Sequence, residues 1–269
     1  GFAQDVDKFR YHAGDRLNIG LGDHIGMIQA RFERPRHDAV SRAICCDPEE
    51  TIMSLRSRLY AIVDAGVASR AGWTPTALAH AYLKGGARLM QLRTPGVDTT
   101  KRLRWCREIA GMAARSGAQL IVNDRCDLVI VSAVAGVHLG QDDLPVEAAR
   151  RLLGPEAIIG VSTHDDQQVA VTRRKAVNYI ATGPVYPTQT KETGYQAVGL
   201  EAVRRTVALA GPCPVVAIGG ITLATAPDLI EAGVASVAVI SDLLTGGDPE
   251  RRVRRYIAEL GGPCPSEGL

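Results

Sequence analysis

Two aspartates occupy positions from which they could bind a metal ion. Asp124 and Asp143 each follow a short apolar run, Leu120–Val122 and Val137–Leu139, with the composition of a buried strand. If these runs are neighbouring parallel strands, the two carboxylates lie close together and repel each other. A hard divalent cation relieves that repulsion, and Mg2+ is usually held by one or two carboxylates with water and phosphate oxygens. The alternative is that these aspartates, or Asp142 beside them, cap the helices that follow.

Two cationic side chains follow other strand-like runs. Arg93 comes directly after the run Arg88–Leu92, and Lys191 lies downstream of the run Tyr179–Ala181. Arginine presents a planar fork of donors that matches phosphate oxygens, whereas lysine supplies a compact charge. Taken singly, each residue is typical of a solvated surface charge. Placed together at strand ends, they predict a clamp for a diphosphate group.

A third group of residues predicts a site for a phosphate monoester. Gly219-Gly220-Ile221 follows the run Val215–Ile218, Thr222 opens the next helix, and Ile240-Ser241 ends the last run. Glycines let backbone N–H groups approach an anion, and barrels of alternating strands and helices often bind phosphate after their seventh and eighth strands. The long loop at residues 183–199 could cover this site as a lid, since loops of this length are usually functional.

These residues meet on one surface only if the chain alternates strands and helices, and from Arg58 onward it does. The predicted strands are Leu59–Val63, Arg88–Leu92, Leu120–Val122, Val137–Leu139, Ala157–Val161, Tyr179–Ala181, Val215–Ile218 and Ser236–Ile240. The predicted helices are Pro75–Lys84, Thr99–Arg115, Cys126–Ala133, Val146–Leu153, Asp166–Ala176, Leu200–Ala210, Leu223–Ala232 and Pro249–Leu260. Eight strand–helix units with strands apolar on both faces predict an α/β fold, the closed (β/α)8 or TIM barrel.

Length and composition agree with one such barrel and exclude several classes of protein. The 269 residues divide into a charged N-terminal extension of unknown role at residues 1–56 and a barrel domain at residues 57–262. A net charge of +2 gives no overall attraction to nucleic acid or to an anionic membrane, and no apolar run is long enough to span a bilayer. The six cysteines form no metal-binding or disulfide pattern, and no secretory signal is visible, which favours a reducing cytoplasm.

Seven segments together resemble the thiamine phosphate synthase family, in order along the chain from about residue 58 to 245. They are Tyr60–Asp64, Gln91–Arg93, Val122–Arg125, Gly136–Asp143, Gly160–Ser162, Thr182–Lys191 and Ala217–Ile221. The stretch Gly183–Lys191 is the most specific of them. The resemblance implies an enzyme that joins hydroxymethylpyrimidine diphosphate to a thiazole phosphate, with Mg2+ present, and releases diphosphate. It also implies that dimerisation is common, although the sequence leaves the oligomeric state open.

The resemblance further implies a role for individual residues. Mg2+ would bind Asp124 and Asp143, and the pyrimidine would contact Gln91. The diphosphate would be held by Arg93, Asn123, Ser162 and Lys191, of which Arg93, Ser162 and Lys191 would be catalytic. The thiazole phosphate would be received by Thr188, Thr190, Gly220, Ile240 and Ser241.

The chemistry implied by these roles is a dissociative substitution. As the bond to diphosphate lengthens, Mg2+, Arg93 and Lys191 would stabilise the charge that develops on the leaving group. The electron-rich pyrimidine would carry the complementary positive charge until the thiazole nitrogen attacks. That nitrogen has no proton to lose, so the reaction needs no general base.

One departure from the family pattern leaves two alternatives open. Two residues after Arg93, where family members carry a diphosphate-contacting lysine, this chain has Pro95, and losing such a contact would cost about 1.5–3 kcal/mol. Lys101 or Arg102 could compensate. Otherwise the chain could be a non-catalytic or weakened phosphometabolite-binding barrel. The second alternative is a thiazole tautomerase, which would need a histidine near neutrality; the candidates are His138, in a strand, and His164, which could instead cap a helix.

Overall fold

A computed structural model describes residues 55, 57–188, 190 and 194–261 of the chain. Within these residues, eight parallel strands pair in chain order and close into a barrel, because β1 pairs with both β2 and β8. The strands are β1 (Leu59–Asp64), β2 (Leu89–Arg93), β3 (Gln119–Asn123), β4 (Gly136–Leu139), β5 (Ile158–Thr163), β6 (Tyr179–Thr182), β7 (Val215–Ile218) and β8 (Ser236–Val239). The predicted (β/α)8 fold is therefore confirmed. The predicted extension at residues 1–56, apart from Leu55, lies outside the described residues.

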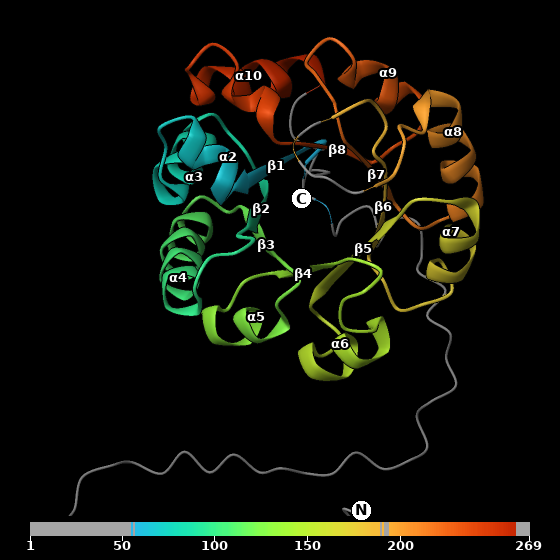
Figure 1. Cartoon of the computed structure of the whole chain (residues 1–269), viewed down its shortest axis with the longest axis horizontal. Coiled ribbons are helices and arrows are strands. Elements are labelled where there is room, and N and C mark those ends of the chain that lie inside the picture. Colours follow the sequence, from blue (N-terminus) through green and yellow to red (C-terminus); the bar gives the residue numbers. More distant parts are fainter. Residues whose placement is uncertain (1–54, 56, 189, 191–193, 262–269) are drawn as a thin grey trace, which may run out of the picture. The chain divides into compact units, whose positions relative to one another are not determined.

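Helices surround this barrel on its outer side, as Figure 1 shows. They are α2 (Ala65–Arg70), α3 (Pro75–Lys84), α4 (Thr99–Arg115), α5 (Cys126–Ser132), α6 (Val146–Leu153), α7 (Asp166–Thr172), α8 (Gly199–Ala210), α9 (Ala226–Glu231) and α10 (Pro249–Glu259), with a short 3-10 helix η1 (Ser241–Leu244) after β8. The start of α3 follows the expected signals, because Thr74 accepts a hydrogen bond from the Ala77 N–H at 3.2 Å and Pro75 occupies the first helical position. No helix in the described part of the chain is long and apolar enough to cross a bilayer.

The strands pack on both faces, and this explains why their sequences are almost continuously apolar. In β1, Leu59, Ala61 and Val63 pack in the outer core beneath the helices. The alternate residues Tyr60 and Ile62 point into the barrel, where they join side chains from β2, β3, β5, β6, β7 and β8. Within the described residues the interior of the barrel is thus a filled core, so a ligand site on the barrel is expected at one of its ends.

Four helical segments differ from the prediction by more than one residue. Neither α2 nor η1 was expected, and α9 begins at Ala226 instead of Leu223. The later start of α9 has a local cause: the Thr222 N–H donates to Thr225 Oγ1 at 3.0 Å, so residues 222–225 form a side-chain-stabilised turn, and Pro227 then occupies the second helical position. Helix α7 stops at Thr172, short of Ala176, and the chain then forms turns in which the Arg174 and Lys175 N–H groups donate to the carbonyl oxygens of Val171 and Thr172.

Four buried tyrosines make the stability of the barrel sensitive to alkaline pH. Tyr60, Tyr82, Tyr179 and Tyr256 are at most 1% exposed, and burial raises the pKa of each above its ordinary value of 10.0. The unfolded chain releases these protons first. The free energy of unfolding should therefore be unaffected by them below pH 10, and should fall above it by about 1.4 kcal/mol per pH unit for each tyrosine.

Tyr82 offers a clean test of this prediction, because its hydroxyl has no hydrogen-bond partner among the described residues. We expect urea unfolding between pH 8 and 11.5 to show little change in stability for Tyr82→Phe at pH 8. Above pH 10, the free energy of unfolding of this variant should fall less steeply with pH, by about 1.4 kcal/mol per pH unit. Equal slopes for the two proteins would contradict it.

Candidate active site

A cavity of about 640 Å3 opens at the carboxyl ends of the strands. All the predicted site residues that the structure describes line it: Gln91, Arg93, Asn123, Asp124, Asp143, Ser162, Thr188, Thr190, Gly220, Ile240 and Ser241. Lys191 lies outside the described residues. Residues that are far apart in the sequence are thus brought to one mouth by the parallel register of the barrel, as the strand-end argument predicted.

The aspartates of this cavity do not cap the helices that follow them. Helix α5 has Arg125 and α6 has Pro145 at the N-cap position, and neither helix has a side-chain capping bond. Asp143 instead accepts a hydrogen bond through Oδ2 from the Gly140 N–H at 2.6 Å, which fixes the loop after β4. Capping therefore accounts for neither Asp124 nor Asp143, and both residues line the cavity.

The backbone at Asp124 supports this interpretation. Its φ angle is 65°, a left-handed conformation that aspartate and asparagine adopt more readily than other non-glycine residues. The Asp124 N–H donates to the His138 carbonyl oxygen at 2.8 Å, so the conformation is held by the pairing of β3 with β4. Unusual backbone geometry of this kind often occurs at functional sites.

Arg93 lines the cavity but also has a structural partner. One of its guanidinium nitrogens forms an ion pair with Asp64, its register partner on β1, and the side chains are 16% and 3% exposed. Asp64 in turn accepts the Val67 N–H at 2.9 Å and so caps α2. The guanidinium is therefore held in place at the rim, with its remaining N–H groups as donors for an anion.

The turn that contains Pro95 is fixed by Arg102. Nη2 of Arg102 donates to the carbonyl oxygens of Thr94 and Val97 at 3.0 and 2.9 Å. Gly96 has a φ of 68°, as the third residue of such a Pro-Gly turn requires. Arg102 is consequently committed to the backbone of the turn, which leaves it poorly suited to replace the missing lysine.

A chain of side-chain hydrogen bonds crosses the barrel beneath the cavity. Gln91 Nε2 donates to Tyr60 Oη at 3.0 Å, and Tyr60 Oη lies 3.0 Å from Tyr179 Oη. Tyr179 Oη lies 2.9 Å from His138 Nδ1, and His138 Nε2 lies 2.8 Å from Ser162 Oγ. The raised pKa values of both tyrosines, due first to burial, keep their hydroxyls protonated at neutral pH.

The direction is fixed at one end of this chain, because an amide nitrogen can only donate, so Gln91 donates to Tyr60. At the other three bonds the donor depends on the orientation of the hydroxyl groups and on the tautomer of His138. Ser162, which lines the cavity, is in either case held by the ring of His138.

The two histidines weighed for proton transfer are both engaged. His138 uses each ring nitrogen within the chain of bonds just described. His164 donates through Nδ1 to the Gly183 carbonyl oxygen at 2.6 Å, and its ring stacks on Tyr195 with centroids 3.8 Å apart. The expectation that His164 caps α7 is wrong, because Asp165 holds that position.

The predicted phosphate loops form one wall of the cavity. Gly219 and Gly220 have φ angles of 101° and 65°, and a Cβ at Gly220 would lie 2.7 Å from the Pro187 carbonyl oxygen. Only glycine fits this close approach of two backbones. On the same wall, the hydroxyl oxygens of Thr190 and Ser241 are 2.7 Å apart, which ties the proposed lid segment to η1. Residues 189 and 191–193 of that segment lie outside the described residues, and its closure stays a prediction.

Sequence reasoning missed some of the polar residues of this region. Tyr60 and Tyr179 were placed in strands and given no polar role from the sequence, although a buried tyrosine hydroxyl usually needs a partner and so signals a polar network. Asp242 also lines the cavity, where an acidic residue next to an anion site looks unfavourable. The sequence held one indication of its role: Arg252 and Tyr256 are four residues apart, so a helix presents both donors on one face to a shared acceptor.

A closed (β/α)8 barrel with carboxylates, a fixed guanidinium and a glycine-rich wall at its mouth defines the class of barrel enzymes that act on phosphorylated small molecules. The profile of the family described as thiamine monophosphate synthase matches residues 59–243. The chain belongs to this family, and by that membership it is a transferase of thiamine biosynthesis.

Individual relatives agree with the family assignment. The chain is 40% identical over 205 residues to a thiamine-phosphate synthase of Koribacter versatilis, covering 76% of this chain and 95% of that protein. It is 39% identical over 208 residues to a bifunctional thiamine biosynthesis protein of Symbiobacterium thermophilum, of which it spans only 42%, against 77% of its own length. Among solved structures, a thiamine phosphate pyrophosphorylase from Pyrococcus furiosus superposes with a TM-score of 0.69 at 27% identity, covering 77% of this chain and 97% of that one.

Proposed function

We propose that this chain joins hydroxymethylpyrimidine diphosphate to a thiazole phosphate, producing thiamine phosphate and diphosphate. The observation that carries the proposal is that one cavity brings together two carboxylates that cap no helix, an arginine held by an ion pair, and a glycine-rich wall. Two relatives, of which this chain covers 87% and 95% of the length, are named thiamine-phosphate synthase, and this name supports the same reaction.

The residues present fit a magnesium ion. Asp124 and Asp143 come from the ends of adjacent strands and line one cavity, and neither is used as a helix cap. The described residues contain no group of three or more acidic, histidine or cysteine side chains that would suit a more fully protein-coordinated metal. Two carboxylates with water and phosphate oxygens are a typical Mg2+ environment, and the bound ion would supply charge neutralisation for the departing diphosphate.

The protein's own groups have separate tasks in this reaction. Arg93, held by Asp64, donates to diphosphate oxygens together with Asn123, Ser162 and Lys191, and these donors stabilise the growing negative charge. Because His138 Nε2 already contacts Ser162 Oγ at 2.8 Å, the serine side chain is held in place before substrate arrives. Such preorganisation avoids the cost of turning dipoles during the reaction.

The two ring substrates occupy different parts of the cavity in this proposal. Gln91, whose amide is fixed by Tyr60, contacts the pyrimidine at the floor of the barrel. The thiazole phosphate binds along the wall formed by Gly220, Ile240 and Ser241, with Thr188 and Thr190 from the lid segment. Holding the thiazole nitrogen against the pyrimidine carbon supplies much of the rate acceleration, and no proton transfer is required.

Diphosphate release, measured with a coupled assay, tests the proposal directly. We expect release only when both substrates and Mg2+ are present, and an equal yield of thiamine phosphate. Lys191→Ala should lower kcat by about 10²-fold, because it removes a charge-assisted contact to the leaving group, whereas the matched control Lys84→Ala, on the exposed end of α3, should be active as before. Binding of both substrates in calorimetry without any diphosphate formed would instead identify a non-catalytic binder.

A further inference from the structure

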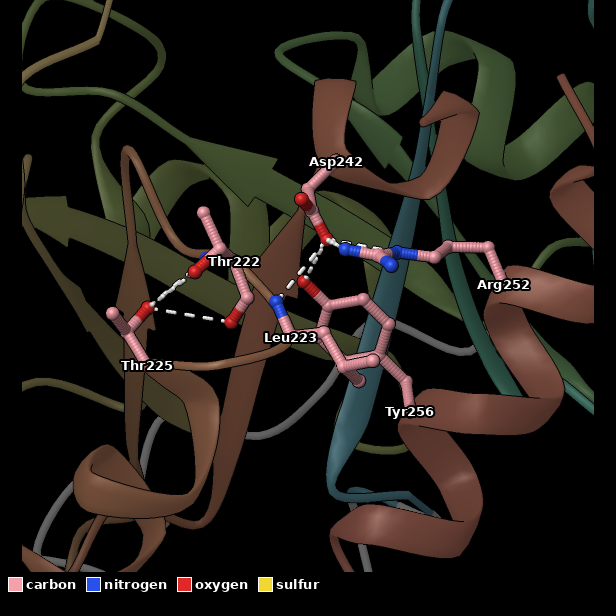
Figure 2. A network of polar contacts seen from close by, with 6 residues as sticks. All are labelled: Thr222, Leu223, Thr225, Asp242, Arg252 and Tyr256. Carbon is pink, nitrogen blue, oxygen red and sulfur yellow. Dashed lines mark hydrogen bonds and ion pairs between the residues drawn. The ribbon is translucent and has the colours of Figure 1, made fainter. Parts of the chain in front are cut away.

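One carboxylate at the mouth of the barrel links three segments through a single oxygen. Asp242 Oδ2 accepts hydrogen bonds from Arg252 Nε and Nη2 at 3.1 and 2.7 Å, from Tyr256 Oη at 2.6 Å, and from the Leu223 N–H at 3.2 Å. Figure 2 shows these donors converging on Asp242 from α10 and from the loop after β7, with Thr222 beside them. The contact joins η1, α10 and the start of the segment that leads to α9.

The environment of these groups makes the link rigid. The Asp242 and Arg252 side chains are 13% and 15% exposed, and Tyr256 is fully buried. Burial, followed by the bond to Asp242, raises the pKa of Tyr256, so its hydroxyl stays protonated and acts as the donor at all ordinary pH values. Hydrogen bonds to a charged acceptor in such a setting are stronger than those between neutral groups.

A carboxylate at this place is unfavourable for an anionic ligand unless it has another role. Asp242 lines the cavity and follows Ser241 directly, so its charge lies near the proposed site of the thiazole phosphate. Arg252 neutralises that charge with a paired guanidinium. Because one oxygen of Asp242 accepts these four hydrogen bonds from neighbouring protein segments, its function is better explained by positioning than by contact with the ligand.

The segments that Asp242 joins form the two halves of the phosphate wall, which is the side of the cavity made by Gly219 and Gly220 after β7 and by Ile240 and Ser241 after β8. The Leu223 N–H belongs to the loop that begins with Gly219 and Gly220, while Asp242 itself belongs to η1, which begins with Ser241. We propose that Asp242 is a positioning residue that holds these halves in register through Arg252 and Tyr256, and thereby sets the affinity for the phosphorylated thiazole. This inference rests on the proposed function.

Asp242→Asn is the principal test, because it keeps the shape and one acceptor oxygen but removes the charge that pairs with Arg252. We expect the KM for thiazole phosphate to rise about tenfold or more, while kcat and the KM for the pyrimidine diphosphate stay within about twofold. Preference for thiazole phosphate over the unphosphorylated thiazole alcohol should fall by a similar factor. Tyr256→Phe removes one donor and no charge, and should shift the same constant by a smaller amount.

The matched control is Glu250→Gln, which removes an ion pair with Arg254 on the outer side of α10. It should leave both KM values unchanged. An unchanged KM for thiazole phosphate in Asp242→Asn, or an equal rise in both KM values, would overturn the proposal. If Asp242→Asn does not fold, Tyr256→Phe decides by the same two criteria.

Failure of the proposed function would be recognised separately. An unmodified chain that forms no thiamine phosphate would refute the reaction. Calorimetry would still measure the affinity of the phosphate wall for thiazole phosphate and for inorganic phosphate. Weaker binding of thiazole phosphate to Asp242→Asn than to the Glu250→Gln control would support the positioning role, and equal binding would refute it.

Discussion

Asp124→Asn should lower kcat for diphosphate release by about 10²–10³-fold while the barrel remains folded. The substitution removes one of the two carboxylates proposed to hold Mg2+, so the concentration of Mg2+ needed for half-maximal rate should rise as well. Asparagine is the informative replacement because it tolerates the φ angle of 65° at this position, whereas alanine would add backbone strain to the loss of charge. Steady-state rates across a Mg2+ titration, with unfolding measured in parallel, give both quantities.

The control for this experiment is Asp166→Asn, at an exposed aspartate in the first turn of α7 that is not among the residues lining the cavity. It changes the net charge equally and should leave the rate and the Mg2+ dependence unaltered. An Asp124→Asn protein with an unshifted Mg2+ titration and full kcat would show that this carboxylate does not bind the metal.

Gly160→Ala should destabilise the barrel by about 3 kcal/mol or more and abolish most activity. A Cβ at Gly160 would lie 1.9 Å from Cζ of Tyr179, so the aromatic ring must move. Displacing it breaks the bonds from Tyr179 to Tyr60 and to His138 inside the barrel, so His138, the partner of Ser162, loses the contact at its other ring nitrogen. Urea denaturation and the diphosphate assay measure the two effects.

A second background separates the clash from any other cost of alanine. When Tyr179→Val is already present, adding Gly160→Ala should cost less than about 1 kcal/mol, because the ring is gone and alanine suits a strand better than glycine. Gly111→Ala, in α4, where the nearest neighbour of a Cβ is a flexible arginine end at 3.4 Å, should be neutral or slightly stabilising. Equal costs of Gly160→Ala in both backgrounds would argue against overlap with Tyr179.

The fold could be predicted because its signals are local. All eight predicted strands are confirmed to within two residues at either end, and the helices at Pro75–Lys84, Thr99–Arg115 and Val146–Leu153 have the expected bounds. Strand composition, capping residues and the period of the helices each act over a few residues. The parallel register then places the strand ends together, so most of the site followed from the fold.

What could not be predicted depends on contacts between distant segments. The start of α9 is set by a threonine pair, and α2 exists because Asp64, which also pairs with Arg93, caps it. The chain of bonds from Gln91 to Ser162 requires five strands to be assembled first. Asp242 was missed for the same reason, since its donors lie on a helix and a loop that only the closed barrel brings together.

Closure of the barrel by β1 and β8 has a consequence for synthesis of the protein. Leu59 pairs with Val237, so β1 has to wait on the ribosome until its partner β8, the last strand of the barrel, has been synthesised. The mouth takes residues from strands along the whole domain, and no shorter nascent chain contains a complete set. The complete mouth can therefore form only after β8 has left the exit tunnel.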